Sequence, residues 1–231
     1  MKRLMCAPLA LSLLAIFSST APAQDKMTTY YLVLLNRGKA QATVDQAEAA
    51  KIQEQHIAHL TKLGDQGHGL AAGPFGDDGE IRGIVIMKAD SAQHVRELEE
   101  ADPAVKAGRL AIDVIAFMAP EGWFKKPAQP FSMEQLYFAF LKEGATRTQD
   151  PETARRLQSE HLAYMDDQHK QGALVMAGPI VDKGSTRRGV VVYRAASLIE
   201  ARSRAEGDPM VRAGRLAIEM HPWYVAKGVL Q

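Results

Sequence analysis

Two histidines stand at matching places in the two halves of this 231-residue chain. His56 and His161 each follow an apolar residue by four positions, Ile52 in the first half and Leu157 in the second. An imidazole titrates near neutral pH, so a positioned histidine can act as a general acid or base and accelerate a reaction by about 10²–10⁴-fold. A place on an apolar helical stripe also suits a buried, hydrogen-bonded core histidine, and that alternative stays open. We predict that His56 and His161 are catalytic.

Two aspartates could complete the same chemistry. Asp102 and Asp208 are each followed by proline, a pair that typically begins a short helix with Asp as the N-cap and Pro as the first helical residue. A capping carboxylate can also face a histidine, hold its tautomer and stabilise the imidazolium that forms. We predict that Asp102 and Asp208 are the catalytic partners of the histidines. Whether the side chains touch is left open by the sequence.

Seven further residues are candidates for substrate binding. A Gly-Pro pair ends the second expected strand of each half, where it can form a turn or bring the backbone close to a ligand. An arginine opens each last strand, where its planar guanidinium can hold a carboxylate or lie in solvent. A tyrosine follows His161 on the same expected helix. The candidates are Gly73, Pro74, Arg109, Tyr164, Gly178, Pro179 and Arg215.

The sequence gives little support for a metal or a cofactor. His56 and His59 are three residues apart, but the counterpart of His59 in the second half is Tyr164, and a lone histidine pair is a weak zinc signal. The chain also lacks G-x-S-x-G, G-x-x-x-x-G-K-[ST] and G-x-G-x-x-G motifs, which leaves serine-elbow catalysis and nucleotide binding without support. We therefore predict no metal and no cofactor.

An internal repeat determines the expected architecture. The run "EADPAVKAGRLAID" at 100–113 returns as "EGDPMVRAGRLAIE" at 206–219, with ten of fourteen positions identical. Each half reads as strand, helix, strand, strand, helix, strand, which is the ferredoxin-like split βαβ order. Such a sheet carries both helices on one face, and the other face must be covered. We predict an α+β fold in which two tandem domains, 27–118 and 135–227, pack sheet to sheet as an intramolecular α+β barrel, joined by a Pro-rich linker at 119–134.

The N-terminus predicts export. Residues 1–23 combine Lys2 and Arg3, an apolar run and an Ala-Pro-Ala site, the pattern of a cleaved signal peptide. Cleavage would remove the single cysteine, Cys6, and leave 26 basic against 27 acidic residues, a net charge of −1 with histidine neutral. That balance lacks the basic character of nucleic-acid-binding domains. We expect a periplasmic or secreted protein with no nucleic-acid partner and no membrane attachment after cleavage.

The repeated motifs resemble the YCII-related (YciI-like) domain family. They are "QEQHIAHL", "AAGPF" and "ADPAVKAGRL" in the first copy, and "QSEHLAYM", "MAGPI" and "GDPMVRAGRL" in the second. The resemblance implies a dimeric α+β barrel fold in which a recurring His and Asp have an enzymatic role. The characterised chemistry nearest to it is a dechlorinating lyase acting on a hydroxylated chloroaromatic, and the wider fold includes lactone isomerases and monooxygenases.

These features together predict a function for the exported chain. We expect a cofactor-independent lyase, isomerase or hydrolase that uses His–Asp proton transfer on a small molecule. The alternative is a non-catalytic periplasmic protein that holds a small ligand in the same pockets. Because each half supplies the partner that the other needs, we expect an intramolecular pseudo-dimer that is a monomer or a weak oligomer.

Overall fold

The computed structural model describes residues 26–40, 44–147 and 150–230. The predicted signal peptide lies outside these ranges. In the first copy the elements are β1 (Met27–Arg37), α1 (Gln46–Asp65), β2 (Gly69–Pro74), β3 (Ile81–Met87), α2 (Ala92–Glu100), α3 (Pro103–Lys106) and β4 (Leu110–Pro120). In the second they are β5 (Met133–Glu143), α4 (Pro151–Lys170), β6 (Leu174–Pro179), β7 (Arg187–Tyr193), α5 (Leu198–Glu206), α6 (Pro209–Arg212) and β8 (Leu216–Ala226).

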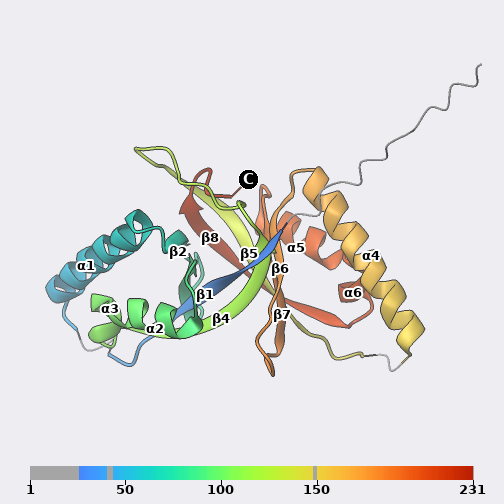
Figure 1. Cartoon of the computed structure of the whole chain (residues 1–231), viewed down its shortest axis with the longest axis horizontal. Helices are drawn as coiled ribbons and strands as arrows, with labels where there is room; N and C mark the ends of the chain where they lie inside the picture. The colour runs from blue at the N-terminus through green and yellow to red at the C-terminus, as the bar shows by residue number, and fades with distance from the viewer. Residues whose placement is uncertain (1–25, 41–43, 148–149, 231) are drawn as a thin grey trace, which may run out of the picture.

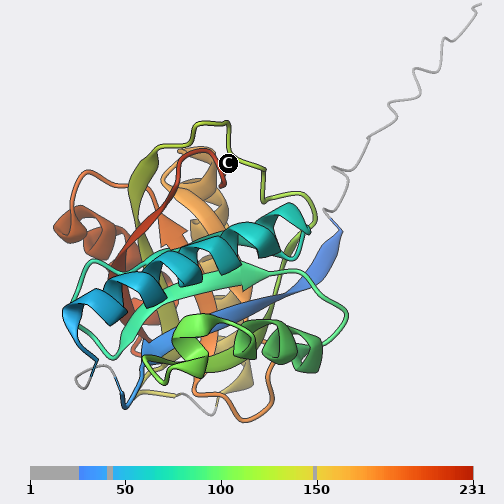
Figure 2. The same cartoon turned by 90° about the vertical axis from the view of Figure 1, so that its left-hand side faces the viewer.

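Each copy forms one antiparallel four-stranded sheet, in the order β2-β3-β1-β4 and β6-β7-β5-β8. The central strands β1 and β5 are the apolar runs, and each has six consecutive buried residues. Runs of that kind are buried on both faces, by helices on one side and by the other sheet on the opposite side. In Figure 1 the helices of the two copies lie on opposite outer sides and the sheets meet between them, and Figure 2 shows α1, α2 and α3 covering the first sheet. The predicted α+β fold of two tandem ferredoxin-like units is confirmed.

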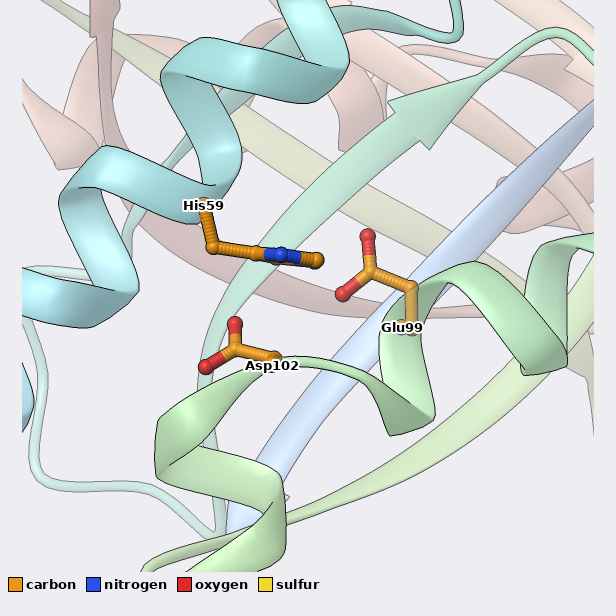
Figure 3. Close-up of side chains that lie close together, drawn as sticks. All are labelled: His59, Glu99 and Asp102. Atoms are coloured by element: carbon orange, nitrogen blue, oxygen red, sulfur yellow. The ribbon is translucent and has the colours of Figure 1, made fainter.

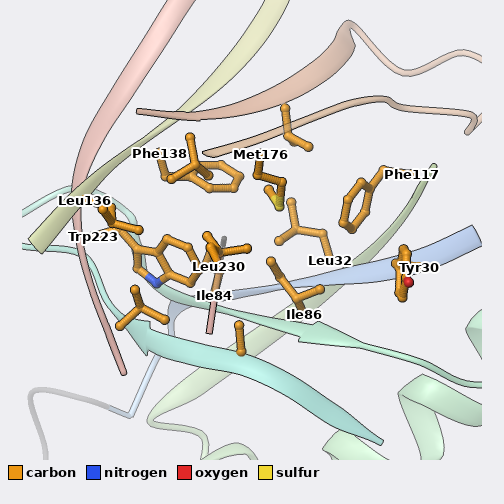
Figure 4. Close-up of a cluster of buried hydrophobic side chains, with 14 of the residues drawn as sticks. Tyr30, Leu32, Ile84, Ile86, Phe117, Leu136, Phe138, Met176, Trp223 and Leu230 are labelled. Atoms are coloured by element: carbon orange, nitrogen blue, oxygen red, sulfur yellow. The ribbon is translucent and has the colours of Figure 1, made fainter. Parts of the chain in front are cut away.

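The two sheets close on each other through their edge strands. Strand β2 runs beside β8 and β4 runs beside β6, with bridges at Phe75–Trp223 and Phe117–Ile180. The largest apolar cluster fills the space between the sheets with side chains from both copies, among them Leu32, Ile84 and Phe138 (Figure 4). Burial of this shared cluster, which no single copy encloses, holds the barrel together.

Two glycines permit the closure. A Cβ at Gly73 would lie 1.8 Å from the carbonyl oxygen of Tyr224, and a Cβ at Gly178 would lie 2.0 Å from that of Met118. Both glycines lie in edge strands at the seams between the copies. Their absent side chains therefore have a structural reason besides the turn or ligand approach considered from the sequence.

The helices near the candidate residues begin with aspartate N-caps. Helix α1 begins after Asp45, whose side chain accepts the N–H of Glu48. The short helices α3 and α6 begin with the Asp-Pro pairs, so Asp102 and Asp208 are N-caps. Gly108, at φ +68°, ends the turn before β4. Among the described helices none is both long and apolar enough to cross a membrane.

Candidate functional site

His56 and Asp102 form a direct pair in the first copy. Helix α1 buries Ile52, His56 and Leu63 against the sheet, so the apolar stripe places the imidazole inward. His56 Nδ1 lies 2.5 Å from Asp102 Oδ2, and Asp102 Oδ1 accepts the N–H of Ala104 at 2.7 Å. Asp102 is completely buried. The same carboxylate therefore caps α3 and orients the histidine, so the two roles that the sequence offered for Asp102 coexist.

The second copy repeats this geometry. His161 Nδ1 lies 2.6 Å from Asp208 Oδ2, and Asp208 Oδ1 accepts the N–H of Met210 at 2.8 Å. The His161 side chain is 13% exposed and that of Asp208 is 2% exposed. Contact between histidine and aspartate, left open by the sequence, is therefore present in both copies. In each pair Nδ1 is engaged by the carboxylate, which leaves Nε2 as the nitrogen available to a reacting group.

A cavity of about 850 Å³ borders His56. It lies between α1, strand β2 and the segment that joins the copies, and its wall includes Leu60, Phe124 and Phe131. The sequence-predicted residues Gly73, Pro74 and Arg109 also lie on this wall. A pocket with mostly apolar walls and few polar groups suits a small organic molecule. The first copy thus brings four of its five predicted site residues to one cavity, and the fifth, Asp102, touches His56.

The second-copy candidates have other surroundings. Tyr164 donates its hydroxyl to the carbonyl of Arg204 at 2.6 Å, and burial raises the pKa of this phenol. Gly178 and Pro179 end β6 at the other seam of the barrel. Arg215 directly precedes β8. None of these four residues lines the cavity beside His56.

A second polar cluster, which sequence reasoning missed, lies next to the first pair. His59, Glu99 and Asp102 each offer a ligand atom, and these atoms lie within 4.8 Å of one another. Figure 3 shows the three side chains, from α1, α2 and the start of α3, pointing toward one another. Both oxygens of Glu99 and Nε2 of His59 are buried without a hydrogen-bond partner. Burial, with a smaller contribution from Asp102, raises the pKa of Glu99 from 4.5 to about 8, and burial lowers the pKa of His59.

Two features of the sequence could have indicated that Glu99 is buried. Glu99 follows Val95 by four residues, and these two are the buried residues of α2. In the aligned repeat its counterpart is Ala205, as that of His59 is Tyr164. Glu99 belongs to the run Glu97-Leu98-Glu99-Glu100, which reads as a solvated acidic face when burial is unknown.

A third histidine–carboxylate pair joins the two copies. His221 Nδ1 lies 2.7 Å from Asp77 Oδ2, and its ring stacks on Phe75 with centroids 4.4 Å apart. From the sequence His221 had no counterpart in the repeat and no role was predicted for it. The contact spans 144 positions of the chain, so no local pattern could have indicated it.

Comparisons with known proteins agree with this architecture. The family model for the YCII-related domain matches residues 29–118 and 136–223. Among solved structures, a chlorite dismutase from Candidatus Nitrospira defluvii superposes with a TM-score of 0.57 at 9% identity, covering 87% of this chain and 92% of that one. A heme-binding protein from Thermus thermophilus superposes with a TM-score of 0.53 at 12% identity, covering 90% and 94%. At these identities the likeness is one of fold. No curated protein matches the chain.

Proposed function

The chain belongs to the YCII-related domain family, and from that premise we propose that it is an acid–base enzyme acting on a small molecule bound beside His56. The observation that carries the proposal is the 2.5 Å contact of His56 with Asp102 on the wall of a cavity of about 850 Å³. A buried carboxylate on Nδ1 fixes the ring and stabilises its protonated form, so Nε2 can remove a proton from the substrate and return it.

The surroundings favour a particular class of substrate. Apolar and aromatic side chains of the cavity, such as Leu60 and Phe124, suit a ring or a short carbon skeleton, and Arg109 can hold an anionic group such as a phenolate or carboxylate. We therefore propose lyase, isomerase or hydrolase chemistry on a hydroxylated aromatic or lactone-like molecule, driven by proton transfer without a cofactor. We also propose that residues 1–23 direct export to the periplasm.

A screen for both binding and turnover tests this proposal. Hydroxylated and chlorinated aromatics and small lactones are added to the protein, and thermal shift reports binding while chromatography reports new products. We expect a compound that binds and is converted, and we expect the combined His56→Ala and His161→Ala variant to stay folded and lose conversion. His94→Ala, which alters a histidine outside both pairs, is the matched control. Conversion that survives the double substitution would refute the acid–base assignment.

The second candidate is a binding protein without turnover, which the apolar cavity favours because such walls suit a small organic ligand. One structural neighbour is a heme-binding protein, so hemin belongs among the probes, with its visible absorption as the readout. His56, whose Nδ1 is held by Asp102 at the cavity, is the residue that would bind the iron of such a group. A compound that binds and is recovered unchanged after long incubation would favour this second function.

A further inference from the structure

The carboxylate of Glu99 has surroundings that the proposed function does not explain. The residue is completely buried, and neither of its oxygens has a hydrogen-bond partner. Its neighbours in the cluster are the buried carboxylate of Asp102 and the imidazole of His59. A buried polar group without a partner costs about 1–3 kcal/mol, and more when it is charged. Because folding alone gives no compensation for this cost, the buried carboxyl of Glu99 points to a functional role.

The imidazole of His59 points toward the carboxylates of Glu99 and Asp102 (Figure 3). Its Nε2 is buried and has no hydrogen-bond partner. In the neutral tautomer that carries its proton on Nδ1, an imidazole has a lone pair on Nε2. A neutral imidazole nitrogen of this kind is a common ligand of zinc and other first-row metals.

We propose that His59, Glu99 and Asp102 bind one divalent transition-metal ion of the zinc type in the first copy. The set supplies one imidazole nitrogen and two carboxylate donors, a combination found at zinc and other first-row metal sites. The charge of a divalent ion balances the two carboxylates. Donor atoms about 2.0–2.2 Å from a tetrahedral ion lie about 3.5 Å apart, so the observed separations within 4.8 Å require only a modest contraction. Three protein donors leave a fourth position for water.

The second copy supports the inference by its differences. Tyr164 occupies the position of His59, and its hydroxyl is satisfied by the carbonyl of Arg204. Ala205 occupies the position of Glu99 and is buried in an apolar cluster. Asp208 remains and pairs with His161 as Asp102 pairs with His56. The pair of histidine and aspartate therefore does not require the additional polar groups, which occur only in the first copy.

This site goes beyond the proposed function, although the two share Asp102. The same carboxylate would contact the ion and His56, so an ion there would withdraw electron density from the partner of the acid–base histidine. The proposal also departs from the sequence-based prediction of no metal. Metal binding itself requires no turnover, and it can be measured whether or not a substrate is known.

The test uses the untagged full chain, stripped with a chelator, and titrates it with Zn²⁺ by calorimetry and with Co²⁺ by visible absorption. We expect one equivalent of each ion to bind and Co²⁺ to develop d–d bands of a low-coordinate site. The paired substitution His59→Tyr and Glu99→Ala installs the residues of the second copy and should abolish binding. Glu99→Gln keeps the shape and should weaken binding by about 100-fold, since even outer-sphere partners are worth about 10–100-fold.

Two controls separate this site from other histidines and from the proposed function. His68 and His94 lie with ring centroids 5.3 Å apart and can bind an added ion adventitiously, so His94→Ala must leave the titration unchanged. His56→Ala must also retain the ion, even though the proposed function predicts that it loses conversion. Absence of binding in the folded chain, or binding that depends on His94 and ignores Glu99, would overturn the proposal.

Discussion

Replacement of Glu99 by glutamine should remove a large part of the pH dependence of stability in the metal-free protein. The folded-state pKa of about 8 exceeds the usual 4.5 because burial disfavours the carboxylate and the nearby Asp102 repels it. The folded protein therefore holds a proton that the unfolded chain releases. Stability from this group is fully present below pH 4.5, declines as the pH rises, and is lost once the pH exceeds about 8.

The magnitude follows from the interval between the two pKa values. At 1.36 kcal/mol per pKa unit, the change from 4.5 to about 8 corresponds to roughly 4–5 kcal/mol of unfolding free energy between acid and alkaline limits. Total stabilities of single domains are about 5–15 kcal/mol, so an effect of this size is measurable by denaturation.

Urea denaturation between pH 5 and pH 9, in the presence of a chelator, measures the effect. The difference between wild type and Glu99→Gln isolates Glu99, because every other titratable group is the same in both proteins. We expect wild type to lose about 4 kcal/mol relative to the variant over this range, since most of the transition lies within it. Glu100→Gln, at an exposed position of the same helix, is the matched control. A difference that stays constant from pH 5 to pH 9 would refute the argument that Glu99 is protonated in the folded state.

Three further predictions address the closure and the acid–base pair. Gly73→Ala should destabilise the barrel by about 1–3 kcal/mol or more, because its Cβ would meet the Tyr224 carbonyl at 1.8 Å. Gly64→Ala, whose Cβ has no neighbour nearer than 3.8 Å, should be neutral or stabilising in the same thermal melts, and equal effects would contradict the steric argument. Asp77→Asn should lower the free energy of unfolding by about 1–3 kcal/mol, because it weakens the hydrogen bond to His221 between the copies. Asp78→Asn, at an exposed position, should leave the free energy of unfolding unchanged. Urea denaturation of both variants tests this, and equal effects would contradict it. Asp102→Asn should lower kcat of any identified conversion by about 10²-fold or more with KM little changed, and unaltered kcat would exclude the carboxylate from catalysis.

The architecture was predictable from the sequence because its determinants are local and repeated. The apolar run at β1 and the stripe through Ile52 and His56 each specify an element on their own, and the second copy provides an independent reading of the same order. The packing of sheet on sheet followed from one physical requirement, that the bare face of each sheet be covered. The Gly-Pro pairs were placed correctly at the ends of β2 and β6. The close contact of each glycine with a strand of the other copy was not predicted, because it depends on distances that no spacing in the sequence expresses.

The candidate site was predictable in part. The sequence identified His56 and Asp102 as candidate site residues but left their contact open. That contact depends on the turn from α2 into α3, which brings the N-cap of α3 under α1. Glu99 was missed because a glutamate among other glutamates indicates a solvated surface until burial is known. Its contrast with Ala205 in the aligned copy was available, and differences between repeats at buried helical positions are therefore worth as much attention as identities.

The duplication also bears on why the polar cluster exists. The second copy has the same fold without the polar cluster. There the Tyr164 hydroxyl is hydrogen-bonded and Ala205 packs among apolar neighbours. The requirements of folding therefore do not explain His59 and Glu99 in the first copy. There, three of their side-chain atoms are buried without partners, and burial raises the pKa of the Glu99 carboxyl to about 8. Proteins tolerate such local conflicts mainly at functional sites. The same copy carries the cavity beside His56. The proposed metal site and the cavity of the proposed function thus both involve residues of the first copy, and the second copy completes the barrel.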